Sequence, residues 1–129
     1  MPDREAVLLS TLEDIKVSIE LVLKRFRHIP NSDAFLADEE GLEKLDSISM
    51  RLIAIGEGFK NVDKLSGYTL LQNYPSIQWK KVKGIRDVLS HHYFDLDAET
   101  VFNVCQNHLN NLLDVTIRII EDMKYSDEN

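Results

Sequence analysis

Apolar residues recur at alternating spacings of three and four along almost the whole chain, and this pattern constrains the fold more than any other feature. Such spacing places the apolar side chains on one face of an α-helix. No stretch shows the alternation of apolar and polar residues that is typical of a β-strand. The clearest stripe consists of Leu8, Leu12, Ile15, Ile19, Val22 and Phe26. We therefore predict an all-α protein.

Start and stop signals delimit the first two helices. Asp3 is a favourable N-cap residue for the first helix, and Pro30 lies just beyond its expected end because proline cannot continue a helix. Two glycines, Gly56 and Gly58, lie within the second apolar stripe, where each costs about 1 kcal/mol relative to alanine. They indicate either the close approach of another helix or an end of the helix near Lys60.

Two more helices complete the pattern. A long connection over residues 61–76, with room for a short helix, precedes a third helix that begins near residues 76–78 and extends to about residue 90. The fourth helix begins near Asp95 or Asp97 and continues to Met123. The fold class that we predict is an antiparallel four- to five-helix bundle.

Composition limits the classes of protein to which the chain can belong. Residues 1–129 are enough for one domain, and the hydrophobic fraction of 43% is that of a globular protein. No apolar run approaches the roughly 20 residues of a membrane helix, and the charged N-terminus does not resemble a signal peptide. The single cysteine, Cys105, excludes an internal disulfide and reads as a small buried hydrophobic residue. We expect a cytoplasmic protein that contacts no membrane.

The charge is unevenly distributed. The chain carries a net charge of −7, which argues against non-specific nucleic-acid binding by the whole surface. Residues 79–92 nevertheless carry +3, from Lys80, Lys81, Lys83 and Arg86 against Asp87. This basic segment suits one local polyanion site, although a solvated lysine face of a helix would have the same charge.

Residues 86–93 concentrate the reactive side chains. They supply a cation, a carboxylate, a hydroxyl, two imidazoles and a phenol, from Arg86, Asp87, Ser90, His91, His92 and Tyr93. An arginine can hold a phosphate and a histidine can move a proton near neutral pH. Together they are a minimal set for cleaving a phosphodiester.

Helical geometry suggests how these side chains meet. If the third helix reaches Ser90, Asp87 and His91 are four residues apart and share a face, so the carboxylate can orient the imidazole. Arg86 and His91 are about 140° apart on such a helix. One chain alone therefore makes an awkward site, whereas two chains packed around this helix would place both pairs in one cleft. This favours a homodimer.

Other polar residues have simpler interpretations. Adjacent histidines point to different faces of a helix and no third ligand lies at a usual spacing, so we predict no metal site and no cofactor. His108 lies on the apolar face of the fourth helix and is expected to be a hydrogen-bonded core histidine. Trp79 is expected to be a packing anchor. Glu57 is either a surface carboxylate or a buried partner of Arg86.

Arg-x4-His-x-Tyr, at Arg86, His91 and Tyr93, resembles the signature of the HepT-like toxin branch of the HEPN superfamily. The surrounding sequence is also similar to this family, in Ile-Gly-Glu at 55–57, Tyr-Pro at 74–75, Trp79, Gly-Ile-Arg-Asp at 84–87 and His-Tyr-Phe at 92–94. The resemblance covers essentially the whole chain. One departure is His92, which occupies a position where many relatives carry glutamate.

The resemblance implies an HEPN-like bundle and a metal-independent ribonuclease that acts as the toxin of a toxin–antitoxin pair. Its antitoxin would be a small nucleotidyltransferase that attaches AMP to Tyr93. Arg86, His91 and Asp87 would then be catalytic, and RNA, not DNA, would be the substrate. Lys80, Lys81, Lys83 and His92 would contact the RNA, with Glu57 and Ser90 behind the site. The alternative is a non-catalytic HEPN module that binds nucleotide or serves as the adaptor subunit of a nucleotidyltransferase.

Overall fold

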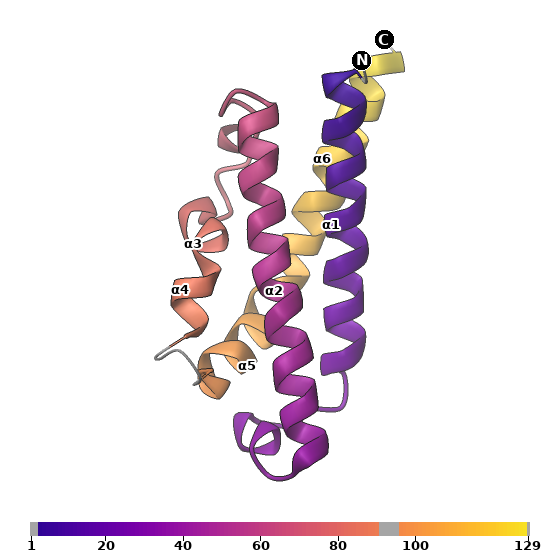
Figure 1. The fold of residues 1–129 in the computed structure, drawn as a ribbon. Helices are drawn as coiled ribbons and strands as arrows, with labels where there is room; N and C mark the ends of the chain where they lie inside the picture. Colours follow the sequence, from indigo (N-terminus) through magenta and orange to yellow (C-terminus); the bar gives the residue numbers. More distant parts are fainter. Residues whose placement is uncertain (1–2, 91–95, 129) are drawn as a thin grey trace.

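The computed structural model describes residues 3–90 and 96–128, and this part of the chain is almost entirely helical (Figure 1). Its only strand-like pairing is an isolated antiparallel bridge between Ser90 and Leu96. The all-α prediction is therefore confirmed. The elements, in chain order, are α1 (Arg4–Phe26), the 3₁₀-helix η1 (Ser32–Phe35), α2 (Glu39–Leu65), the 3₁₀-helix η2 (Leu71–Asn73), α3 (Trp79–Lys83), α4 (Ile85–Leu89), α5 (Ala98–Asn107) and α6 (Leu109–Glu128).

Three long helices, α1, α2 and α6, form the frame of the bundle (Figure 1). Helix α2 runs antiparallel to α1, and α6 returns so that its last turns lie beside the first turns of α1. An ion pair between Lys124 and Glu13, at 3.2 Å, joins α6 to α1 near this end. Helices α3 and α4 lie along the other side of α2.

Helix α1 follows its sequence pattern closely. The Asp3 carboxylate accepts a hydrogen bond from the backbone N–H of Glu5 at 3.2 Å, which caps the helix. The helix ends at Phe26, four residues before Pro30. All six residues of the predicted stripe are buried, and the ring of Phe26 packs on Phe35 of η1 and Phe102 of α5.

Helix α2 extends to Leu65, so an end near Lys60 is wrong. Its two internal glycines mark close contacts instead. A Cβ atom at Gly56 would lie 2.7 Å from the carbonyl oxygen of Val82, and one at Gly58 would lie 2.8 Å from Cγ1 of Ile15. The first glycine admits the α3–α4 segment and the second admits α1.

Two predicted helices are each broken into two. The third breaks at Gly84, which is the C-cap residue of α3. The backbone N–H of Gly84 donates the last hydrogen bond of that helix, to Lys80 O at 3.1 Å. The fourth begins after Asp97, as predicted, and breaks at His108, where φ is −125° and ψ is −29°. Glycine is a poor helix former, and asparagine and histidine are weak ones. The bundle therefore has six α-helices in its described part where four or five were expected.

The connection between α2 and α3 is anchored on α6. The Tyr74 hydroxyl donates to an Asp122 carboxylate oxygen at 2.6 Å. Burial, together with this hydrogen bond, raises the pKa of Tyr74 to about 12. The 3₁₀-helix η2 within this connection confirms the short helix that the sequence left room for.

Cys105 lies in the core on α5 and is 1% exposed, as its pattern predicted. Burial raises the pKa of its thiol to about 12, so this group is an unreactive packing residue. Among the described residues, no helix is both long enough and apolar enough to cross a membrane.

Candidate active site

Arg86 lies on α4, with its side chain exposed to solvent. It makes no ion pair with any residue in the described part of the chain. Asp87 follows it and is also exposed. An exposed guanidinium without a protein carboxylate partner remains available to an external anion such as a phosphate.

Three contacts hold α3 and α4 against α2 and so place Arg86. The absence of a side chain at Gly56 lets Val82 and Ile85 approach the α2 backbone. The ring of Trp79 packs on Phe59, with 4.9 Å between ring centroids. The Trp79 indole N–H also donates to the carbonyl oxygen of Tyr74 at 2.9 Å, so Trp79 is the packing anchor that its sequence position predicted.

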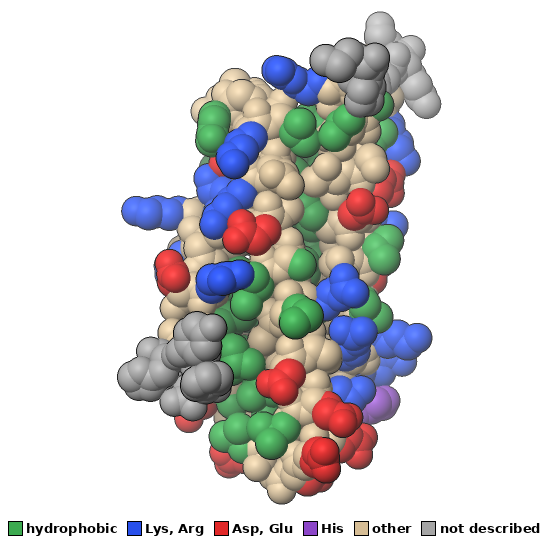
Figure 2. Space-filling view, in the orientation of Figure 1, with side chains coloured by type: hydrophobic (Ala, Val, Ile, Leu, Met, Phe, Trp, Pro, Cys, Tyr) green, Lys and Arg blue, Asp and Glu red, His purple; other side chains and the backbone are tan. Residues whose placement is uncertain are grey.

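The third contact separates the three lysines of α3 into two kinds. The Lys83 ammonium is paired with the carboxylate of Asp63 on α2, whose side chain is only 9% exposed. Lys83 therefore serves to attach α3 to α2. Lys80 and Lys81 are exposed and have no such partner in the described chain. Figure 2 shows Lys and Arg side chains gathered over α2 and α3 on this face.

Helix α4 ends at Leu89, which is completely buried. Ser90 is exposed and extended, with φ −107° and ψ 128°, and it bridges to Leu96. The backbone N–H of Asp97 donates to Leu89 O at 2.8 Å, which draws the two ends of the intervening segment together. The helix therefore does not reach Ser90, so the condition under which Asp87 and His91 would share a helical face is not met.

The predicted catalytic histidine and the predicted modification site, His91 and Tyr93, lie outside the described residues, as does His92. The described structure fixes where the segment that carries them leaves α4 and where it enters α5. Arg86 lies one helical turn before that departure.

Glu57 was expected to be either a surface carboxylate or a buried partner of Arg86, and the structure shows a surface carboxylate. Its side chain is 51% exposed and pairs with Lys60 at 3.3 Å on the same helix. The alternative of a buried partner for Arg86 is wrong. Within the Ile-Gly-Glu sequence at 55–57, it is Gly56 and not Glu57 that contacts the Arg86 segment, through Val82 and Ile85.

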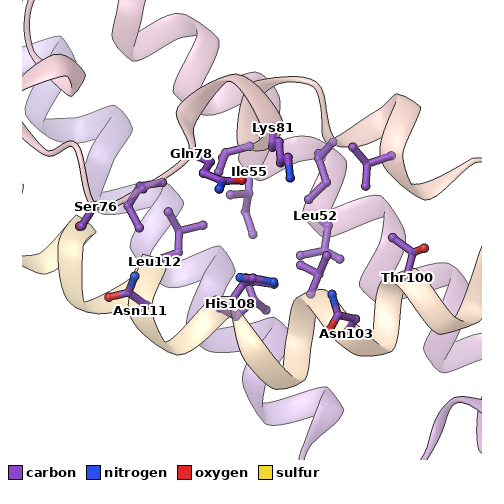
Figure 3. Close-up of a pocket in the computed structure, with 16 residues that line it drawn as sticks. Leu52, Ile55, Ser76, Gln78, Lys81, Thr100, Asn103, His108, Asn111 and Leu112 are labelled. Carbon is purple, nitrogen blue, oxygen red and sulfur yellow. The ribbon is translucent and has the colours of Figure 1, made fainter.

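A cavity of about 390 Å³ adjoins the α4 segment, between α2 and α3–α4 on one side and α5–α6 on the other (Figure 3). Leu52 and Ile55 from α2 form part of its floor, and Val82, Ile85 and Val88 form the wall on the Arg86 side. Gln78, just before α3, and Lys81 on α3 lie opposite the polar residues Thr100, Asn103, His108 and Asn111.

His108 belongs to this cavity and not to the core. It caps the C-terminus of α5, where its backbone N–H donates to Val104 O at 3.0 Å, and its side chain is exposed. The core interpretation is wrong, because residue 108 lies at the break between α5 and α6 with its side chain exposed. The signal missed in the sequence is that residues 100–113 contain no Asp, Glu, Lys or Arg.

Chemically, the described site combines an unpaired guanidinium, two free lysines and an adjoining apolar cavity with a neutral polar rim. No group of three or more potential metal ligands occurs in residues 3–90 and 96–128. The family described as "Ribonuclease HepT-like" matches residues 15–119 of the chain. The chain belongs to this family.

Two relatives match this chain over most of their own length. A protein of Methanocaldococcus jannaschii, named as a candidate RNase (MJ0127), is 30% identical over 98% of this chain and 95% of its own length. "Probable ribonuclease HepT" of Thermococcus cleftensis is 30% identical over 78% of this chain and 84% of its own. No solved structure matches the chain significantly. The HepT-like assignment confirms the resemblance seen in the sequence, and ribonuclease is the enzyme class that it gives.

Proposed function

We propose that this HepT-like protein is the toxin of a toxin–antitoxin pair and cleaves RNA internally without a metal ion. The observation that carries the proposal is Arg86, an exposed cation with no ion-pair partner in the described chain, held on α4 immediately before the segment that contains His91. The family assignment supplies the ribonuclease class. Lys80 and Lys81 extend the positive surface toward α3.

The proposed reaction is a transesterification. The ribose 2′-oxygen attacks phosphorus while the bond from phosphorus to the 5′-oxygen breaks, which leaves a 2′,3′-cyclic phosphate and a 5′-hydroxyl. His91 takes the proton from the 2′-hydroxyl or delivers one to the leaving oxygen. Arg86 holds the phosphate and offsets the charge that develops on its oxygens. Asp87 orients His91 or Arg86.

The proposed active form is a homodimer. Each protomer supplies an Arg86–His91 pair, and the two α4 segments line one groove at the symmetry axis. Mixing Arg86→Ala protomers with His91→Ala protomers tests this arrangement. Partial recovery of cleavage is expected, since a mixed dimer with a shared cleft still holds one Arg86 and one His91, supplied by different protomers. No recovery in verified mixed dimers would contradict a shared site.

The proposed control of the toxin is AMP attachment at Tyr93 by a partner nucleotidyltransferase. The added phosphate would compete with RNA phosphate for Arg86, and the nucleoside would obstruct the strand. Co-expression with a cognate nucleotidyltransferase, followed by peptide mass mapping, is expected to find AMP on Tyr93 and to abolish toxicity. Tyr93→Phe is expected to remain toxic, and normal neutralisation of that variant would contradict the proposal.

The central experiment is RNA cleavage by the wild type, Arg86→Ala and His91→Ala in EDTA. The wild type is expected to cleave and to leave 2′,3′-cyclic phosphate ends. Each variant is expected to lose cleavage while its unfolding curve is unchanged, because Arg86 is exposed and contributes little packing. Cleavage that needs a divalent ion, or that survives His91→Ala, would refute the mechanism. A wild type that binds nucleotide but cleaves no RNA would favour the adaptor alternative.

A further inference from the structure

The cavity beside α4 has the electrostatic character of a site for a negatively charged ligand. The chain contains 22 acidic residues, yet none lines the cavity in the described structure. Lys81 is the one charged residue among its lining groups. A polyanion can therefore approach this surface without the repulsion that much of the acidic body exerts.

The lining also has the chemistry of a site for a nucleobase. Leu52, Ile55, Val82 and Ile85 provide apolar surface against which a flat ring can pack. The rim carries the amides of Gln78, Asn103 and Asn111, each of which offers both donors and an acceptor. The volume of about 390 Å³ lies in the range of about 300–1,000 Å³ that is typical of small-ligand sites.

One rim amide is held in a defined orientation. Asn107 Nδ2 donates to Asn103 Oδ1 at 2.6 Å, within the last turns of α5. This bond leaves the Asn103 amide N–H groups available as donors. Figure 3 places Asn103, His108 and Asn111 on the α5–α6 side of the cavity, across from Gln78 and Lys81.

The cavity is continuous with the proposed catalytic segment. Ile85 and Val88, on its wall, flank Arg86 and Asp87 on the same short helix. A strand whose phosphate lies on Arg86 would therefore bring an adjoining nucleoside to the opening. We propose that this cavity binds one base of the RNA strand that Arg86 holds, and that Asn103 and Asn111 select that base. This inference rests on the proposed function.

A second copy of the chain fits the cavity less well. Covering the opening with protein would bury several amide groups and the Lys81 ammonium, each of which then needs a hydrogen-bond partner. A base supplies donors and acceptors in one plane, and the adjoining phosphate pairs with Lys81. The neutral polar rim is thus matched by RNA.

The test uses 5′-labelled tetranucleotides with 2′-O-methyl groups, which cannot undergo transesterification, in the four homopolymer sequences. Binding to the full chain is measured by fluorescence anisotropy. We expect the four strands to differ in Kd by about five-fold or more, because amides discriminate between base edges. Asn103→Ala and Asn111→Ala are each expected to weaken the preferred strand by about three- to ten-fold and to reduce the preference.

Asn110→Ala is the matched control. Asn110 is an exposed amide one residue from Asn111, but it lines a different cavity beside Lys24 and Arg27. Its substitution is expected to change each Kd by less than about two-fold. Equal effects of Asn110→Ala and Asn111→Ala, or no difference between the four strands, would overturn the assignment.

Two further measurements separate the remaining explanations. A shift of Asn103→Ala or Asn111→Ala from dimer to monomer in sedimentation would make the cavity a protomer interface and overturn the proposal. Nucleoside monophosphates that bind as tightly as the tetranucleotide would place a free nucleotide there and overturn it too. Base-selective binding by a wild type that cleaves no unmodified RNA would refute the proposed function alone.

Discussion

The frame of α1, α2 and α6 and the α3–α4 segment are both helical, but they are stabilised in different ways. Helices α1 and α2 contain 23 and 27 residues and bury a continuous apolar stripe. Helices α3 and α4 contain five residues each, and Leu89 is the one residue in them that is buried. Helices shorter than about 12–15 residues are marginal on their own. The segment that carries Arg86 therefore depends on a few contacts with α2.

This difference separates two classes of substitution. A change in the frame alters the free energy of unfolding of the whole domain. A change in the contacts between α2 and the α3–α4 segment alters where Arg86 lies and leaves most of the core intact.

The largest expected effect on stability comes from breaking the frame. Leu12 is completely buried between α1 and its neighbours, so Leu12→Ala is expected to lower the free energy of unfolding by about 2–5 kcal/mol. Val17 lies on the same helix and is 61% exposed. Val17→Ala is therefore expected to change the free energy of unfolding by no more than about 0.5 kcal/mol. Urea denaturation measures both. Similar losses for the two variants would contradict this view of the frame.

The second effect separates position from stability. Gly56→Ala would bring a Cβ atom to 2.7 Å from the carbonyl oxygen of Val82, so the α3–α4 segment must move. We expect a loss of about 1–3 kcal/mol in stability and a loss of about 100-fold in RNA cleavage, since small displacements of catalytic groups are costly.

Gly58→Ala is the control for this displacement. Its new Cβ would meet the Ile15 side chain on α1 and would leave the α3–α4 segment in place. It is expected to retain cleavage, whatever its effect on stability. Equal losses of cleavage in the two glycine variants would show that the α3–α4 contact does not position the site.

The third effect distinguishes the paired lysine from its neighbour. Lys83→Met leaves the nearly buried Asp63 carboxylate without its partner, so we expect a loss of about 1–3 kcal/mol in stability. Lys80→Met is expected to leave stability unchanged and to reduce the salt dependence of RNA binding by about one unit of log–log slope. Thermal unfolding and binding at several salt concentrations measure these effects. The reverse pattern would mean that Lys83 and not Lys80 contacts RNA.

The smallest expected effect is a loss of stability at alkaline pH, caused by the raised pKa values of Cys105 and Tyr74. It is absent at neutral pH. Burial raises the folded-state pKa of Cys105 to about 12 from an ordinary value of about 9, so the unfolded chain loses this proton first. The contribution of this thiol to stability is therefore constant below about pH 9 and is lost as the pH rises toward about 12. The raised pKa of Tyr74 adds to the fall between about pH 10 and 12. Cys105→Ala is expected to show a shallower decline in urea titrations over this range, and an unchanged slope would contradict it.

Much of the frame was predictable from sequence because it depends on local rules. The stripe from Leu8 to Phe26 and the cap at Asp3 lie where spacing and capping chemistry placed them. The fourth helix begins after Asp97, one of the two starts that the sequence offered. The breaks at Gly84 and His108 were not predicted. Both residues disfavour helix only moderately, and tertiary packing decides whether such a residue interrupts a helix or is carried within it.

The candidate site shows the same division. The sequence by itself determined the all-helical class, the buried stripes, the HepT-like resemblance and the concentration of charge around Arg86, because these depend on residue order. Only the tertiary structure decided that Lys83 pairs with Asp63 while Arg86 has no ion-pair partner in the described chain, and that His108 faces a cavity and not the core. The physical reason is that partners such as Lys83 and Asp63 are 20 residues apart and meet only when helices pack.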